Sequence, residues 1–236
     1  MCYHYSLGKT KAQVEKKMNA TSFTEVQLPV FHAGAFGSAA VMPVVRADSP
    51  SVLTPMTWGL IPHWSTEEKI SFNTANAKLE GIVHKASFRK PIQSKRCLIP
   101  ADGFYEWRHE GGIKYPYFIS EPQKELFCFA GIFDEWVNNV TGEVTESFSI
   151  LTQEANALMA RIHNVKKRMP IVVPSKRYTE YLEEKNVNVL LEDMESKWEA
   201  PELVAHTISK NFLKKPNTSE KWSPFEYPEL ALLDVS

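Results

Sequence analysis

The sequence is poor in cysteine, and the spacing of the few cysteines excludes two common roles for this residue. There are three in 236 residues, Cys2, Cys97 and Cys128, without the Cys-X-X-Cys pair or the cysteine–histidine spacing of a zinc site. We therefore expect neither a disulfide framework nor a metal site, and no motif calls for another cofactor. Cys97 and Cys128 lie in apolar segments, where a free cysteine usually packs as a small hydrophobic residue. Only Cys2 lacks such surroundings.

Long apolar runs and an excess of charge of either sign are also missing. No stretch approaches the roughly 20 apolar residues of a membrane-spanning helix, and the N-terminus lacks the apolar core of a signal peptide. We expect a cytoplasmic protein with no membrane partner, associated with the nucleoid in a bacterium. The net charge of −1 argues against a protein that coats nucleic acid by bulk electrostatics, so a nucleic-acid site would have to be local. Basic clusters within 85–96, 166–168 and 210–215 could provide it, although each could equally be a solvated face.

The distribution of prolines and of apolar residues indicates many short elements. Fifteen prolines and ten glycines are spread along the chain, which favours tight turns and a single domain over residues 1–236. Thr10 and Gln13 resemble a capping box at the start of a helix over 10–18. Other helices are expected within Asn76–Ser87, Glu154–Ile162 and Ser175–Glu184. Strands are expected around Ala39–Arg46, Leu53–Trp58, Arg96–Ile99, Tyr115–Ile119, Phe127–Phe133, Ser147–Thr152, Ile171–Val173 and Ala205–Ile208.

The order of these elements predicts the fold class. Strands and helices do not alternate regularly, as they would in a parallel α/β protein. We expect an α+β fold with a mainly antiparallel, barrel-like β core and peripheral helices.

Met1-Cys2 is the first candidate site. A small second residue lets the cell remove the initiator methionine, which would leave Cys2 with a free α-amine, a 1,2-aminothiol. An aldehyde that condenses with the amine can then be captured by the sulfur in a five-membered thiazolidine ring. The reference pKa of an α-amine is about 7.7–8.0 and that of lysine about 10.4, so the α-amine is roughly several hundred times more often unprotonated near neutral pH. By itself, a Met-Cys start is also compatible with a cysteine of no special role.

Glu106 and His163 are candidates for proton transfer. Glu106 stands between Tyr105 and Trp107, and burial among aromatic residues favours the neutral acid, which could protonate a substrate oxygen and later act as a base. The alternative is a strand residue that points to solvent between two core aromatics. His163, beside the basic cluster at 166–168, could relay protons near neutral pH or could be a structural histidine.

Asn76 and two tryptophans are candidates for binding. Asn76 could position a carbonyl or hydroxyl group, or could equally be the N-cap of the helix expected there. Trp58 and Trp64 flank Pro62, and exposed aromatic rings could stack on unpaired bases at roughly 1–3 kcal/mol per base. Of the two, Trp58 better fits a core position and Trp64 a stacking position.

Taken together, these motifs resemble one family. Their order is that of the SOS response-associated peptidase (SRAP) family over most of the chain, and the motifs that carry the resemblance are Met1-Cys2, WGLIPHW at 58–64, NAKLE at 76–80, CLIPADGFYEW at 97–107, and Ile162-His163 followed by Arg168-Met169-Pro170. The resemblance implies a compact, monomeric α+β domain whose cleft binds single-stranded DNA containing abasic sites. It also implies a thiazolidine adduct between the abasic site and the N-terminal cysteine, which shields the lesion in the DNA damage response. The family name records an earlier assignment as a thiol autopeptidase.

The resemblance assigns catalytic roles to Cys2, Asn76, Glu106 and His163, with Glu106 and His163 assisting the opening of the abasic sugar. In three places the chain departs from the family pattern. Tyr3-His4 stands where Gly-Arg is common, Lys78 stands where arginine is usual, and four residues instead of one separate His163 from Arg168, which indicates an inserted loop. The tryptophans, the basic clusters and the carried-over positions give the expected DNA-binding set His4, Trp58, Trp64, Lys78, Arg89, Arg168 and Lys210.

Two other functions use the same residues and stay open at this point. In a cysteine peptidase or autoprotease, which could also remove Met1, Cys2 would attack an amide with His163 as the base and Asn76 in an orienting or oxyanion role. A non-catalytic module would bind single-stranded DNA in a salt-sensitive way and form no covalent product. Paired tryptophans and three basic clusters favour a DNA function, because a peptidase has no need for them.

Overall fold

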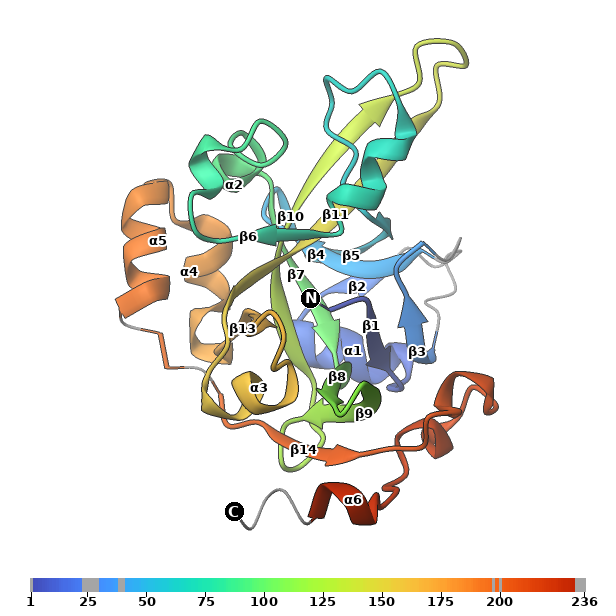
Figure 1. The fold of residues 1–236 in the computed structure, drawn as a ribbon. Helices are drawn as coiled ribbons and strands as arrows, with labels where there is room; N and C mark the ends of the chain where they lie inside the picture. The colour runs from blue at the N-terminus through green and yellow to red at the C-terminus, as the bar shows by residue number, and fades with distance from the viewer. Residues whose placement is uncertain (1, 23–29, 38–40, 197, 200, 232–236) are drawn as a thin grey trace.

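The computed structural model describes residues 2–22, 30–37, 41–196, 198–199 and 201–231 (Figure 1).

The first helix is the one that local sequence signals specify most fully. α1 (Lys11–Met18) begins after Thr10, whose side chain accepts a hydrogen bond from the backbone of Gln13 while the Gln13 side chain accepts one from the backbone of Thr10. Val14 and Met18 form its buried side. The helix predicted over 10–18 and its capping box are confirmed.

One sheet has five strands in the order β14-β9-β8-β1-β3, and the pairings described for it are antiparallel. β1 lies between β8 and β3, so the residues that precede it enter the middle of the sheet. β8 and β9 form a hairpin whose turn contains Gly111 and Gly112, with φ angles of 54° and 79° that favour glycine. The strands are β1 (His4–Leu7), β3 (Phe31–Ala35), β8 (Gly103–Glu110), β9 (Ile113–Ser120) and β14 (Val204–Thr207).

The other sheet has nine strands and is mixed. Seven follow the order β12-β11-β10-β7-β4-β5-β2, β13 pairs with β10, and β6 pairs with β11. Its parallel pairings join β5 and β6 to β11, and β2 to β5. The strands are β2 (Thr21–Ser22), β4 (Met42–Arg46), β5 (Ser49–Trp58), β6 (Asn76–Lys78), β7 (Arg96–Ala101), β10 (Phe127–Val137), β11 (Val144–Glu154), β12 (Arg168–Pro170) and β13 (Val172–Val173).

The two sheets enclose a common hydrophobic core. Tyr5 of the five-stranded sheet meets Trp58 and Phe129 of the nine-stranded sheet edge-on, with ring centroids 5.4 and 5.8 Å apart, and Phe104 meets Phe129 at 5.7 Å. All four side chains belong to one buried cluster that draws on both sheets. The predicted α+β fold, with its mainly antiparallel, barrel-like β core and peripheral helices, is confirmed.

The helices lie around this core, with α4 and α5 together on one flank (Figure 1). Within the described ranges, every helix is too short or too polar to cross a bilayer. The α-helices after α1 are α2 (Pro91–Ser94), α3 (Ala157–Ile162), α4 (Tyr178–Glu183), α5 (Val187–Ser196) and α6 (Pro228–Ala231), and the 3₁₀ helices are η1 (Glu68–Asn73), η2 (Ile82–His84), η3 (Ser175–Arg177), η4 (Phe212–Lys214) and η5 (Ser219–Trp222).

The prediction of a helix within Asn76–Ser87 is wrong. Asn76–Lys78 form β6, which pairs in parallel with β11, and only the short 3₁₀ helix η2 follows. Ala75, Asn76 and Ala77 are all buried, which a surface helix would not allow for three consecutive residues. Pairing with a distant strand decides this segment, and no local signal announces it.

The other predicted segments overlap observed elements, with shifts at their ends. Helix α3 begins three residues later than predicted because β11 continues to Glu154. The segment Ser175–Glu184 divides into η3 and α4. The start of the predicted strand Ala39–Arg46 lies outside the described residues.

Candidate functional site

Cys2 is buried where the chain enters the five-stranded sheet. It precedes β1, which is fixed by the pairing of Tyr5 with Phe104 of β8 and with Gly34 of β3. Its side chain has no exposed surface, and Sγ lies 3.4 Å from the backbone oxygen of His4. Burial raises the pKa of the Cys2 thiol, and the nearby carboxylate of Glu106 raises it further. The sulfur is therefore held as a neutral thiol, which must release a proton when it forms a bond.

Asn76 holds the backbone of Cys2 from the other sheet. β6 places Asn76 opposite Ile150 of β11, and its Nδ2 donates a hydrogen bond of 2.9 Å to the carbonyl oxygen of Cys2. Its Oδ1 is buried with no hydrogen-bond partner among the described residues. Because Asn76 lies in a strand, its interpretation as a helix N-cap is wrong. The amide is placed to orient Cys2 and keeps one acceptor for a further group.

Glu106 lies on β8, and only 2% of it is exposed. The neighbouring Tyr105 belongs to a separate apolar cluster with Phe118 and Phe212, while Glu106 lines a cavity. The alternative of a glutamate that points to solvent is therefore wrong. The Glu106 carboxylate also raises the pKa of the Cys2 thiol, which links the two groups electrostatically.

His163 ends α3 and lines the same cavity. It is 8% exposed, and its Nδ1 lies 2.8 Å from the backbone oxygen of Arg168. The backbone nitrogen of Arg168 lies 3.3 Å from the same Nδ1, so both backbone groups of Arg168 hold the imidazole ring, and its tautomer decides which of the two forms the hydrogen bond. The four residues before Arg168 form a loop that leaves His163 on the cavity wall.

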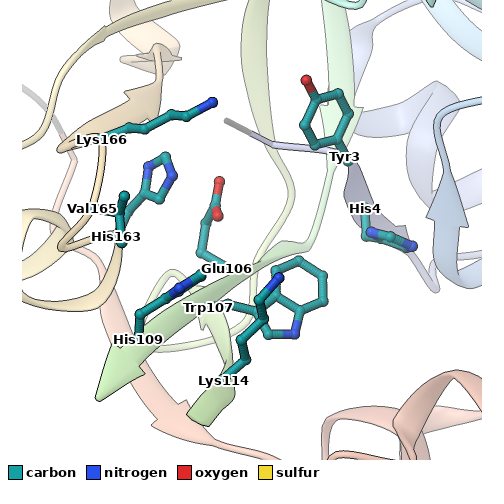
Figure 2. Close-up of a pocket in the computed structure, with 9 residues that line it drawn as sticks. All are labelled: Tyr3, His4, Glu106, Trp107, His109, Lys114, His163, Val165 and Lys166. Carbon is teal, nitrogen blue, oxygen red and sulfur yellow. The ribbon is translucent and has the colours of Figure 1, made fainter. Parts of the chain in front are cut away.

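The cavity has a volume of about 440 Å³ (Figure 2). In Figure 2 the Glu106 carboxylate and the His163 ring both point into it, with Tyr3 on the far side. Among the described residues, no group of histidine, cysteine and acidic side chains is arranged to hold a metal ion. The lining residues are Tyr3, His4, Glu106, Trp107, His109, Lys114, His163, Val165 and Lys166.

Several cavity residues were not singled out from the sequence, notably Tyr3, Trp107, His109 and Lys114. His109 and Lys114 are paired across the β8–β9 hairpin. The two consecutive glycines at 111–112 between alternating segments are a hairpin signal that could have placed these two residues together.

Five of the seven expected DNA-binding residues are at least partly accessible, namely His4, Trp64, Lys78, Arg89 and Lys210. His4 lines the cavity against the Trp107 ring, at 5.5 Å between centroids, and burial lowers its pKa. Lys78, two residues beyond Asn76, and Arg89 are exposed. Trp64 is 49% exposed and lines a second cavity of about 430 Å³.

Trp58 and Arg168 do not lie on an exposed surface, so their burial does not support the DNA contacts expected of them, which stay predictions. Trp58 is 3% exposed, its Nε1 donates to the backbone oxygen of Ala75 at 2.8 Å, and its ring is parallel to that of Phe148. Arg168 is 8% exposed and holds the carboxylate of Glu80 through both terminal nitrogens, at 2.7 and 2.8 Å.

Lys210 is exposed but is not part of the cavity lining. Its Nζ lies 4.6 Å from the ring centroid of Tyr115 and 5.1 Å from that of Tyr227. These rings account for its position through a cation–π interaction, so a DNA contact from Lys210 stays a prediction.

Replacement of Arg168 tests its structural role. Arg168→Met is expected to lower the free energy of unfolding by about 1–3 kcal/mol, because it removes charge-assisted hydrogen bonds to Glu80 and the buried bond to the Thr152 carbonyl. The lower part of this range is favoured because the Glu80 side chain is 47% exposed. Urea unfolding measures the loss, and Glu80→Gln should reproduce part of it. Unchanged stability together with a smaller salt dependence of DNA binding would place Arg168 at the DNA interface.

Comparison with known proteins identifies the family. A model described as SOS response associated peptidase (SRAP) matches residues 1–214. This chain belongs to the SRAP family. The "Abasic site processing protein YoqW" of Bacillus subtilis is 35% identical over 184 residues, which cover 77% of this chain and 80% of YoqW. The "Abasic site processing protein HMCES" of Gallus gallus is 36% identical over 147 residues, 53% of this chain and 43% of HMCES.

A solved structure shares the SRAP fold seen here. The crystal structure of a protein from Bacteroides thetaiotaomicron superposes with a TM-score of 0.88 at 31% identity and covers 95% of this chain and all of the other. The resemblance to the SRAP family, inferred from the order of the motifs, is thus confirmed.

Proposed function

We propose that this protein covalently traps abasic sites in single-stranded DNA through Cys2 after Met1 has been removed. The observation that carries the proposal is the joint placement of Cys2, Asn76, Glu106 and His163, which come from the segment before β1, from β6, from β8 and from the end of α3. The names of the relatives, abasic site processing proteins, support the same lesion as the substrate.

The proposed reaction joins an aldehyde to an aminothiol. Glu106 and His163 transfer the protons that open the abasic deoxyribose and expose its C1′ aldehyde. The α-amine of Cys2 then attacks C1′, and a water molecule leaves as the imine forms. Sγ adds to the imine carbon and closes the thiazolidine, while the thiol proton passes to the imine nitrogen. The net products are one thiazolidine and one water.

The environment of Cys2 fits this order of steps. Because burial and Glu106 raise the pKa of the thiol, the free sulfur is a poor first nucleophile. An α-amine has a lower reference pKa than a lysine, so it is the better imine former at neutral pH. Amine-first attack is therefore favoured, with Asn76 fixing the Cys2 backbone and offering Oδ1 to the opened sugar.

The proposal includes removal of Met1 by Cys2 itself, as the peptidase in the family name suggests. Once His163 has taken the thiol proton, Sγ of Cys2 can attack the preceding carbonyl carbon through a five-membered ring and displace the Cys2 amine, which takes up that proton. Water would then hydrolyse the thioester to methionine and free thiol, which leaves the aminothiol ready for the aldehyde. Met1 itself lies outside the described residues.

Single-stranded DNA is proposed as the partner because Trp64 offers an exposed ring for an unpaired base.

We further propose that the chain works as a cytoplasmic monomer with all of its residues in one domain. Size-exclusion chromatography with light scattering tests the monomer.

A crosslinking assay tests the proposed role of Cys2. Cys2→Ala is expected to keep most of its affinity for abasic single-stranded DNA but to lose the band that resists denaturation, because the amine alone forms only a reversible imine. Cys2→Ser should give an adduct only after borohydride reduction. Cys128→Ala, which removes a different buried thiol, serves as the control and should crosslink normally.

The alternatives predict other outcomes of the same assay. A crosslink of equal intensity from Cys2→Ala would remove Cys2 from the mechanism. Salt-sensitive binding with no covalent product from the wild type would favour the simple binding module. Release of methionine without any DNA adduct would favour a peptidase.

A further inference from the structure

The loop between α3 and β12 is fixed across the cavity to strand β8. The side chain of Asn164 accepts a hydrogen bond from the His109 nitrogen at 3.0 Å and donates one to the His109 oxygen at 2.7 Å. At this point β8 is paired with β9 on one side, whereas the described pairs with β1 involve only Gly103 and Phe104. Asn164 therefore occupies the place of a neighbouring strand and satisfies both backbone groups of His109.

The ends of the loop are fixed as well. The Lys167 nitrogen donates to the His163 oxygen at 2.8 Å, and the Lys167 oxygen accepts from the Ala155 nitrogen at 3.0 Å. Lys167 has a φ of 48°, a left-handed conformation that reverses the chain. Lys166 consequently lines the cavity, whereas Lys167 does not.

The cavity walls carry two cations and one carboxylate. Lys166 and Lys114 are exposed, and neither forms an ion pair with a carboxylate among the described residues. In Figure 2 they lie on opposite sides of the Glu106 carboxylate, Lys166 on the loop and Lys114 on the hairpin. Three histidines, His4, His109 and His163, also line the cavity, and burial lowers the pKa of His4, which favours its neutral form. The lysines thus supply the permanent positive charge of the cavity.

We propose that Lys166, held over the cavity by the Asn164–His109 bridge, binds a backbone phosphate next to the abasic sugar, with Lys114 facing the phosphate on the other side. The inference deepens the proposed function, on which it rests. An abasic sugar in a strand carries a phosphate on each side, and a sugar seated at Glu106 would direct these two anions toward the two walls. Asn164 is then a positioning residue that acts through Lys166.

Salt-dependent binding tests this inference without the covalent step. The ligand is a single-stranded oligonucleotide with a tetrahydrofuran abasic analogue, which has no aldehyde, and its binding is followed by fluorescence anisotropy at several salt concentrations. Lys166→Met is expected to weaken binding and to reduce the slope of log K against log salt by about 0.7, the value for one phosphate contact on a single strand. Lys166→Met/Lys114→Met should reduce the slope by about twice as much. Lys167→Met is the matched control and should keep the wild-type slope.

Asn164→Ala separates positioning from fold stability. It changes no charge, so a smaller salt slope from this variant would report a displaced Lys166, which a purely structural asparagine would not produce. Equal slopes for Lys166→Met and Lys167→Met would overturn the phosphate contact. A wild-type slope for Asn164→Ala would overturn the role of the bridge. The binding assay does not measure crosslinking. Failure of the wild type to crosslink natural abasic DNA, in a separate experiment, would instead contradict the proposed function.

Discussion

Protein that retains Met1 is expected to bind abasic single-stranded DNA but to give no stable crosslink to it. With methionine in place, the nitrogen of Cys2 belongs to an amide and cannot form an imine. The thiol alone could give only a hemithioacetal, which reverses readily. Intact mass spectrometry of protein incubated with abasic oligonucleotide measures the difference, and adduct from the Met1 form should fall to background.

The control for this experiment is the same preparation after its N-terminus has been trimmed to Cys2. Trimming should restore the adduct to the level of naturally processed protein. Equal adduct before and after trimming, in a sample that does not remove Met1 during the assay, would contradict the thiazolidine mechanism. Adduct from neither form would favour the peptidase or the simple binding module.

Glu106→Gln is expected to slow crosslinking by a factor on the order of 10²–10⁴ while DNA binding is retained. The substitution keeps the size of the side chain but removes the carboxyl group that we propose gives and takes the protons. Single-turnover crosslinking at saturating DNA, sampled over time on denaturing gels, measures the rate of the chemical steps.

Glu110→Gln provides a matched control on the same strand. Glu110 ends β8 and lies 3.5 Å from the Arg108 guanidinium, outside the cavity lining. Its replacement removes the same charge and should leave the rate almost unchanged. Similar slowing by both variants would point to a general charge effect, and a wild-type rate for Glu106→Gln would remove Glu106 from the proton transfers.

The parts of the fold that the sequence predicted are those whose signals are local. The capping box of Thr10 and Gln13 sets the start of α1 through contacts three residues apart. Strands such as β10 and β11 carry long apolar segments that favour strands. The segment Asn76–Ser87 was predicted wrongly because its conformation depends on β11, which lies more than 70 residues further along the chain.

Contacts with distant residues, rather than local signals, also decide that Trp58 and Arg168 are buried while Trp64 and Lys166 are exposed. The two tryptophans have similar chemistry and lie in one short segment, as do Lys166 and Arg168, and sequence gives weak grounds for choosing between them. Packing against Phe148 buries Trp58, and pairing with Glu80 fixes Arg168. Trp64 and Lys166 keep exposed surface, and Lys166 reaches the cavity.

The sequence by itself determined the family, the fold class and the identity of the candidate nucleophile, because these depend on residue types and on their order along the chain. The tertiary structure decided which candidate groups lie together, since pairing of β6 with β11 brings the Asn76 amide to the Cys2 carbonyl, and β8 and the end of α3 place Glu106 and His163 on one cavity. It also decided the chemical state of the Cys2 thiol, because burial and a neighbouring carboxylate raise its pKa only once the chain has folded around it.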